Sequence, residues 1–196
     1  MKKRFLAVFL ALALCMGLAT PAFAAENSVP AFTDVPSWCA KEAQWAAEQG
    51  ITNGAGSATL FAPNEICAHE EILTFLWRAE GKPAAETTFP RTLLASWYQD
   101  AINWAYEEGI IDGNFTDVAV CPRARAVWYI WKALGEPQAS TPASFSDVPA
   151  SAYYADAVSW AVEKGITKGY GGEDTFAPGE ICTRGQIACF LYRAYN

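Results

Sequence analysis

The sequence predicts an all-α fold in which three helix–loop–helix repeats close into a pseudo-threefold, trimer-like bundle. One set of aromatic, glycine and cysteine positions recurs three times with a period of about 54 to 61 residues, which indicates a repeat architecture. Within each repeat the apolar residues fall at helical spacing. One pair of helices cannot bury its own apolar stripe, so we expect three stripes to pack together. A closed bundle suits three units better than an open solenoid, which would expose both ends.

The repeat is defined by landmarks in a fixed order. A Trp-Ala pair precedes a Gly-Ile pair, a second glycine follows, and an aliphatic residue then precedes a cysteine. The shared positions are Trp45, Trp104 and Trp160, then Gly54, Gly113 and Gly169, then Cys67, Cys121 and Cys182. The expected repeats are 32–82, 89–136 and 145–196. The linkers at 83–88 and 137–144 contain proline, and each preceding helix ends near a glycine.

The third copy shows the expected helices most clearly. Tyr154, Val158 and Ala161 have helical spacing, and the polar, glycine-rich stretch 167–179 is expected to be a loop. Thr183 suits the N-cap of a second helix, and Gln186 completes a capping box three residues later. That helix carries an apolar stripe that needs a packing partner, formed by Ile187, Phe190, Leu191 and Ala194.

Residues 1–24 have the pattern of a secretory signal peptide, and 25–31 form a short lead. Three basic residues precede an apolar run that ends in a small-x-small cleavage site. A lipoprotein signal at Cys15 is the alternative, but Leu14 is large where that peptidase requires a small side chain. No second long apolar stretch follows, so we expect an exported chain without membrane insertion after cleavage.

The composition argues against several classes of partner. The formal net charge is −7 and becomes more negative without the basic leader, which disfavours nucleic acid and anionic membranes. A single histidine and no Cys-x-x-Cys pair argue against structural zinc, and no cofactor is expected. The repeated cysteines fit small buried residues. Five cysteines remain after cleavage of the six present. At least one therefore lacks an intramolecular partner, although Cys39 and Cys189 are a conceivable bridge between the first and third copies.

Enzyme signatures are absent from the sequence. It contains no Gly-x-Ser-x-Gly elbow, no phosphate-binding loop and no histidine pair for a catalytic metal. The repeats occupy the expected mature chain and leave no separate catalytic domain. We therefore expect no enzymatic activity.

The motifs of the repeats resemble a known family. Residues 32–36 and 145–149 read Phe-Thr/Ser-Asp-Val-Pro, and residues 181–186 read Ile-Cys-Thr-Arg-Gly-Gln. This succession resembles the S-layer homology family, whose second helix opens with Thr-Arg-Ala-Glu or Thr-Arg-Ala-Gln. The resemblance implies three repeats in a pseudo-trimeric spindle. It also implies that grooves between neighbouring repeats bind secondary cell-wall polysaccharide, often with pyruvylated sugars, and attach exported proteins to the bacterial cell wall.

Two copies depart from the family pattern. The first has Ala-His-Glu-Glu at 68–71, without the cap oxygen and the arginine. The second has Pro-Arg-Ala-Arg at 122–125, which retains an arginine but loses its acidic or amide partner. Only the third copy is close to the pattern. If a groove needs matched residues from two neighbours, we expect about one intact groove.

Residue chemistry and the resemblance together give the candidate glycan-binding residues Arg184, Gln186, Thr183, Asp147, Asp34, Arg123 and Trp38. Arg184 opens a helix, where it is suited either to receive a carboxylate or phosphate or to form an ion pair that locks two repeats. An aspartate before a helix is more often a cap or turn former. Trp38 shares its repeat position with Trp97 and Tyr153, so sugar stacking and packing both remain open.

Two functions fit these observations. The leading hypothesis is a secreted, non-covalent anchoring module that binds cell-wall polysaccharide through grooves between repeats and so lies at the bacterial cell wall. The alternative is a secreted structural or protein-interaction module that keeps the same fold but has lost most glycan-binding residues. The degenerate first and second copies, and the lack of an attached cargo domain, motivate the alternative.

Overall fold

The computed structural model describes residues 29–92, 95–117, 119–171 and 174–196. The predicted signal peptide and most of the predicted lead lie outside the described residues. In the described part of the chain, no helix is long and apolar enough to span a bilayer.

The described residues form helices throughout, joined by loops, with β-pairing limited to isolated bridges. The all-α prediction is therefore confirmed. In chain order the elements are η1 (Ser37–Cys39), α1 (Ala40–Glu48), α2 (His69–Ala79), η2 (Ser96–Tyr98), α3 (Gln99–Glu107), α4 (Arg123–Ala133), α5 (Ala155–Glu163) and α6 (Arg184–Tyr195), where η1 and η2 are short 3-10 helices. Units 1, 2 and 3 below are the sequence repeats that contain α1 and α2, α3 and α4, and α5 and α6.

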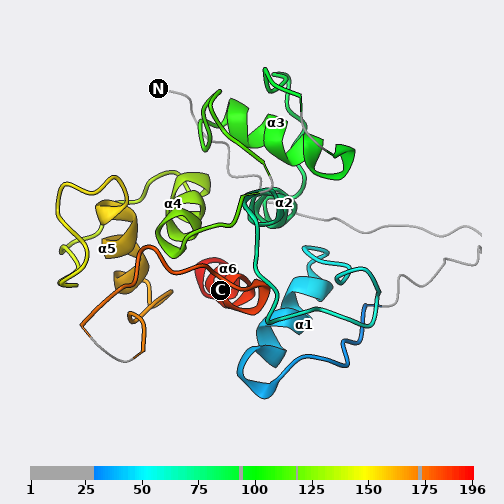
Figure 1. Ribbon diagram of the computed structural model, residues 1–196, viewed down its shortest axis with the longest axis horizontal. Coiled ribbons are helices and arrows are strands. Elements are labelled where there is room, and N and C mark those ends of the chain that lie inside the picture. Colours follow the sequence, from blue (N-terminus) through cyan, green and yellow to red (C-terminus); the bar gives the residue numbers. More distant parts are fainter. Residues whose placement is uncertain (1–28, 93–94, 118, 172–173) are drawn as a thin grey trace, which may run out of the picture.

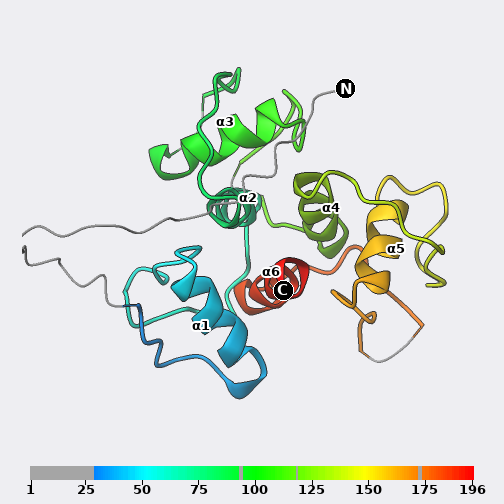
Figure 2. The same cartoon turned by 180° about the vertical axis from the view of Figure 1, so that it is seen from behind.

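The second helices of the units, α2, α4 and α6, lie at the centre of the molecule, and α1, α3 and α5 lie outside them (Figures 1 and 2). Each outer helix packs mainly on the central helix of the preceding unit. Helix α3 packs on α2, α5 packs on α4, and α1 packs on α6. The first helix of a unit therefore finds its main partner in a neighbour, and the α1–α6 contact joins the start of the described chain to its end.

The three segments that precede the central helices meet in a ring of backbone hydrogen bonds. The N–H of Cys67 donates to the carbonyl of Cys182 at 2.9 Å, Cys121 donates to Cys67 at 3.2 Å, and Cys182 donates to Cys121 at 3.3 Å. The side chains of all three cysteines are buried. Ile66 and Val120, each beside a ring cysteine, remain 55% and 47% exposed.

The repeated cysteines are small buried residues, as expected. The structure shows no disulfide between Cys39 and Cys189, so the conceivable bridge between the first and third units is wrong. Burial raises the pKa of both Cys39 and Cys189 to about 11. Both groups therefore remain protonated thiols at neutral pH and react slowly.

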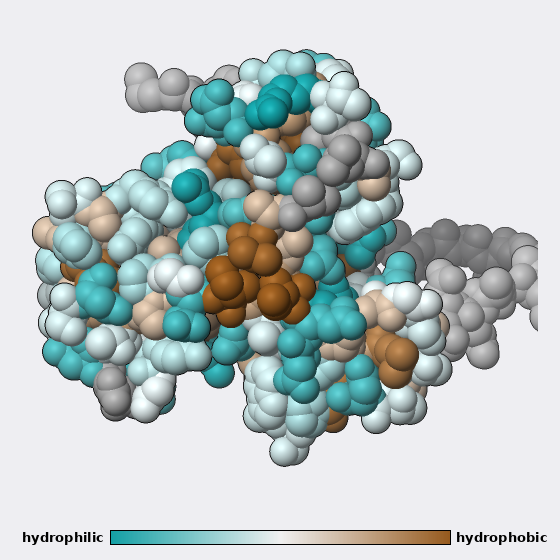
Figure 3. All heavy atoms as spheres, viewed as in Figure 1, coloured by the Kyte–Doolittle hydropathy of each residue, from teal (hydrophilic) through white to brown (hydrophobic). Residues whose placement is uncertain are grey.

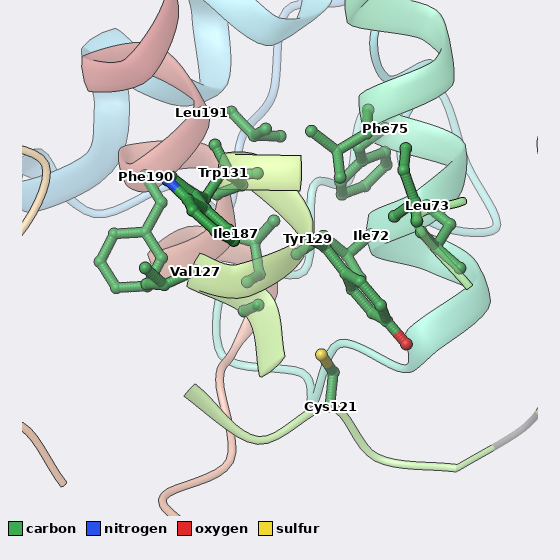
Figure 4. Close-up of a cluster of buried hydrophobic side chains, with 14 of the residues drawn as sticks. Ile72, Leu73, Phe75, Cys121, Val127, Tyr129, Trp131, Ile187, Phe190 and Leu191 are labelled. Carbon is green, nitrogen blue, oxygen red and sulfur yellow. The ribbon is translucent and has the colours of Figure 1, made fainter. Parts of the chain in front are cut away.

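The core lies where the apolar stripes of the central helices meet (Figure 4). Ile72 of α2, Val127 of α4 and Ile187 of α6 are fully buried, with 0% of each exposed. Phe75, Tyr129 and Phe190, each the seventh residue of its helix, are also buried, and of these three only Tyr129 has a polar side-chain atom, its hydroxyl. Burying one such aliphatic side chain contributes about 1.5–3 kcal/mol, so the repeated stripes supply much of the stability.

Candidate functional site

Three surface grooves follow one plan, at the seams between units. Groove 1 lies beside loop 52–56 and α2, groove 2 beside loop 109–116 and α4, and groove 3 beside loop 165–171 and α6. Their volumes are about 560, 580 and 690 Å³. Each groove also receives an aromatic residue from the next unit and the first residue of the central helix of the preceding unit. Every groove is therefore assembled from all three units.

The aromatic position that recurs in the sequence forms one wall of each groove. Trp97 lines groove 1, Tyr153 lines groove 2, and Trp38 lines groove 3. These side chains remain 55%, 53% and 50% exposed. By contrast, in the other recurring set Trp104 and Trp160 are buried, and Trp45 is partly buried and packs against the core. An exposed aromatic ring on a groove wall presents an apolar face on which a sugar ring can stack.

Trp38 lies close to α6 because Gly185 has no side chain. A Cβ at this position would be 2.5 Å from Cη2 of the Trp38 ring and 3.0 Å from the carbonyl oxygen of Pro63. The N–H of Gly185 donates to that same carbonyl at 2.9 Å. This close seam between units 1 and 3 fixes one wall of groove 3.

Arg123 projects from the start of α4 into unit 3. Its Nε donates to the carbonyl of Phe176 at 2.9 Å, and its Nη2 donates to Thr167 Oγ1 at 2.6 Å and to the carbonyl of Gly169 at 3.0 Å. Only 5% of the residue is exposed, and the guanidinium lies 4.8 Å from the ring centre of Phe190. Arg123 thus holds the loop that forms groove 3, and its contact with a ligand remains a prediction.

Arg184, the first residue of α6, lines groove 1 as Arg123, the first residue of α4, lines groove 3. Its Nε donates to the carbonyl of Phe61 at 3.0 Å, and its Nη1 forms an ion pair with Glu71 at 2.6 Å. The residue is 5% exposed. Of the two interpretations of the sequence, the structure shows the ion pair, which ties unit 3 to unit 1. Direct contact between Arg184 and a glycan is not shown and remains a prediction.

In groove 2 the corresponding helix-opening residue is His69, the first residue of α2. Its Nδ1 lies 3.1 Å from the hydroxyl of Tyr129, and the ring is partly buried. Burial, together with the nearby positive charge of Arg125, lowers the pKa of His69 to about 4. The residue is therefore neutral at neutral pH, and groove 2 lacks the buried cation found in the other two grooves.

The buried neutral state of His69 predicts a dependence of stability on pH. The unfolded chain has a histidine pKa of about 6.5, so below that pH only the unfolded state gains the proton. The stabilising contribution is complete above pH 6.5 and is lost as the pH falls towards 4. Between pH 7 and 4.5 we expect the wild type to lose about 1–2 kcal/mol more unfolding free energy than His69→Gln, since partial exposure screens the charge. Urea unfolding at both pH values measures this difference, and equal losses in the two proteins would contradict the assignment.

Thr183 and Gln186 form the predicted capping box. The N–H of Gln186 donates to Thr183 Oγ1 at 3.4 Å, and the N–H of Thr183 donates to Gln186 Oε1 at 3.1 Å. Gln186 also lines groove 3, whereas Thr183 lines none of the three grooves. In unit 1, Glu71 has two roles, because Oε2 accepts from the N–H of Ala68 at 2.9 Å while Oε1 meets Arg184.

Asp34 and Asp147 anchor equivalent turns. Asp34 accepts hydrogen bonds from the N–H groups of Phe61 and Ala62 at 2.8 and 2.7 Å. Asp147 accepts from Phe176 and Ala177 at the same distances, 2.8 and 2.7 Å. Burial opposes ionisation of Asp34, but these amide bonds outweigh it and lower its pKa. Neither aspartate lines a groove, so the geometry shows the turn-forming role that the sequence favoured.

The three grooves differ in charge. Groove 3 is lined by Arg123, Lys168 and Arg193, and no carboxylate of the described residues lines it. Groove 1 is lined by Glu65 and Glu71 as well as by Arg78 and Arg184, and groove 2 is lined by Asp112 as well as by Arg125. Groove 3 is therefore a cationic groove on an acidic protein, which favours an anionic ligand at that seam.

Sequence interpretation missed several groove residues. Lys168 and Arg193 were not among the candidates, although Arg193 recurs as Arg78 in unit 1. Both arginines donate from Nη1 to the backbone carbonyl of the residue directly after a helix-ending glycine, Arg193 to Ile166 at 3.0 Å and Arg78 to Ile51 at 2.9 Å. That recurrence of a basic residue in the last turn of the central helix was the available signal.

The part of the chain that the structure describes contains no group of three His, Cys, Asp or Glu side chains that could hold a metal ion. The grooves are instead lined by aromatic rings, amides and a few charged groups, which are the features of a ligand-binding module.

Parts of the chain are similar to known proteins. Residues 94–114 and 144–188 match the S-layer homology domain. The chain is also 32% identical over 107 residues to the "Surface-layer 125 kDa protein" of Lysinibacillus sphaericus, an alignment that covers 53% of this chain and 9% of that protein. These matches confirm the resemblance to the S-layer homology family that the motifs indicated, and the chain spans only a small part of the length of this relative.

Proposed function

We propose that this chain is a non-catalytic module that attaches to the bacterial cell wall by binding wall polysaccharide in the grooves between its units. The observation that carries the proposal is the composition of groove 3, where half-exposed Trp38 shares a cleft with Arg123, Lys168 and Arg193. The match to the S-layer homology domain and the likeness to a surface-layer protein support the same function.

The chemistry of groove 3 suits an acidic polysaccharide. Trp38 offers a ring face for stacking, and Gln186 offers both a donor and an acceptor for hydroxyl groups. The cations attract a carboxylate, such as that of a pyruvylated sugar, or a phosphate. Because the protein as a whole is acidic, this attraction is local and weakens as salt screens it.

Co-sedimentation with purified cell-wall sacculi tests the proposal. The chain without residues 1–24 should pellet with sacculi, and moderate salt should reduce the bound fraction without abolishing it. Failure to bind at both low and moderate salt would contradict a wall-anchoring function.

Trp38→Ala should weaken sacculus binding by about tenfold, because the stacking face is lost while the charges of groove 3 remain. Leu60→Ala is the matched control, since Leu60 is similarly exposed in the same unit but lines none of the three grooves. Binding isotherms for the two variants measure the difference. Equal affinities would exclude Trp38 as a contact.

The alternative function is a secreted structural or protein-interaction module. An exposed hydrophobic patch outside the three grooves favours this alternative. Hydrophobic side chains gather at the centre of one face, over the central helices (Figure 3), and Ile66 and Val120 are among the most exposed aliphatic residues described. Under this alternative, the native protein would be free in culture medium with no wall-associated fraction. Light scattering would then report self-association.

A further inference from the structure

Groove 2 differs from its neighbours in where its positive charge lies. In grooves 1 and 3 the first residue of a central helix is a buried arginine committed to backbone carbonyls. In groove 2 this residue is His69, which contacts the hydroxyl of Tyr129. The cation of groove 2 is instead Arg125, the third residue of α4, at the position that Glu71 and Gln186 occupy in the other two units.

Arg125 is held by aromatic rings rather than by carboxylates. Its guanidinium lies 4.5 Å from the ring centre of Tyr153, 5.1 Å from that of Trp128 and 5.9 Å from that of Tyr129. The residue is partly exposed. Among the described residues, the ion pairs are Lys132 with Glu136 and Arg184 with Glu71, so Arg125 belongs to neither.

Among the described residues, one carboxylate lines groove 2, that of Asp112, and it is engaged by its own turn. Asp112 Oδ1 accepts a hydrogen bond from the N–H of Asn114 at 2.9 Å. The guanidinium of Arg125 therefore keeps its capacity to bind an anion with two parallel hydrogen bonds. Stacking on three rings restricts its motion, which lowers the entropy cost of binding.

We infer that groove 2 is a second, separate ligand site, which takes a carboxylate or phosphate carried on a sugar chain, with Arg125 contacting the anion and Tyr153 contacting the chain. The inference rests on the proposed function only for the class of ligand. It assigns binding to a groove whose residues depart from the family motif, and it makes Arg125 rather than a buried helix-opening arginine the contact for the anion.

A titration with defined oligosaccharides tests the inference, using the chain without residues 1–24. The probes are oligogalacturonate for a carboxylate, a glycerol phosphate oligomer for a phosphate, and an N-acetylglucosamine oligomer as the neutral reference. The indole N–H signal of Trp128 in NMR spectra reports on groove 2, because Trp128 lines that groove and stacks with Arg125. Binding of oligogalacturonate would identify a carboxylate as the anion, and binding of the glycerol phosphate oligomer would identify a phosphate.

Arg125→Gln should weaken binding of the preferred acidic probe by at least tenfold and leave the neutral probe within twofold. Lys164→Gln is the matched control, because it removes the same charge from an exposed site that does not line groove 2. Tyr153→Ala should weaken the acidic and neutral probes alike. If neither acidic probe shifts the Trp128 signal, or if Arg125→Gln and Lys164→Gln behave alike, the inference is wrong.

Sacculus binding separates this inference from the proposed function. If the wild type pellets with sacculi but Arg125→Gln has no effect on the acidic probes, the inference fails and the anchoring function stands. If the wild type does not bind sacculi, the anchoring function fails, while the probe titration still decides whether groove 2 binds anions.

Discussion

Replacing Arg123 by alanine is expected to lower the free energy of unfolding by about 3–5 kcal/mol. The substitution removes the donor from Thr167 Oγ1 and from the carbonyls of Phe176 and Gly169. An unsatisfied buried polar group costs about 1–3 kcal/mol, and the cavity left beside Phe190 adds to the loss. Urea denaturation followed by circular dichroism measures the change.

Arg125→Ala is the matched control for this prediction. Arg125 belongs to the same helix and has the same side chain, but it is partly exposed and contacts only aromatic rings among the interactions described above. Its loss should therefore cost about 1 kcal/mol or less. Equal destabilisation by the two substitutions would show that the buried hydrogen bonds of Arg123 do not hold the units together.

Gly54→Ala is expected to have the next largest effect on stability, a loss of about 3 kcal/mol or more. Gly54 has a φ of 103°, which is strained for any residue with a Cβ, and that Cβ would lie 2.1 Å from the carbonyl oxygen of Ser57. A second carbonyl oxygen, that of Leu60, would lie 2.8 Å away. Backbone atoms on both sides cannot move aside without opening the loop beside groove 1.

The control for Gly54 is Gly56→Ala in the same loop. Gly56 has a φ of 66°, and a Cβ there would meet nothing within 4 Å. Its substitution should cost only the conformational penalty, about 1–2 kcal/mol. Thermal unfolding of both variants gives the comparison. If Gly54→Ala were no less stable than Gly56→Ala, the close approach at Gly54 would not exist in solution.

Much of the fold was predictable because the same landmark residues recur in each of the three repeats. The recurrence of Gly54 as Gly169 reflects a backbone requirement, since both have φ values near 104°, at 103° and 105°. The Thr183–Gln186 capping box was predictable because its geometry is local to one helix turn. Helix ends and repeated turns depend on residues that are close in the sequence, so they can be predicted from the sequence alone.

The packing partners were not predictable in the same way. An apolar stripe shows that a helix needs a partner, but it does not say which one, so the packing of α1 on α6 appears only in the structure. The direction of the long arginine side chains was also open. Arg184 and Arg123 both turn inward to backbone carbonyls of another unit, a contact between residues far apart in the sequence. The cation of groove 2 was missed because it is Arg125 of α4, whereas the helix-opening residue of that groove, His69 of α2, is neutral.

One NMR titration tests the central claim that wall polysaccharide lies in the grooves between units. Solubilised wall polysaccharide is added to the chain without residues 1–24, and the indole N–H signals of the tryptophans are followed. The account predicts a saturable shift of Trp38, which lines groove 3. Trp77 and Trp131 should not shift, because their indole N–H groups donate to the carbonyls of Pro83 and Pro137 and neither lines a groove. An unchanged Trp38 signal at saturating polysaccharide would contradict the account.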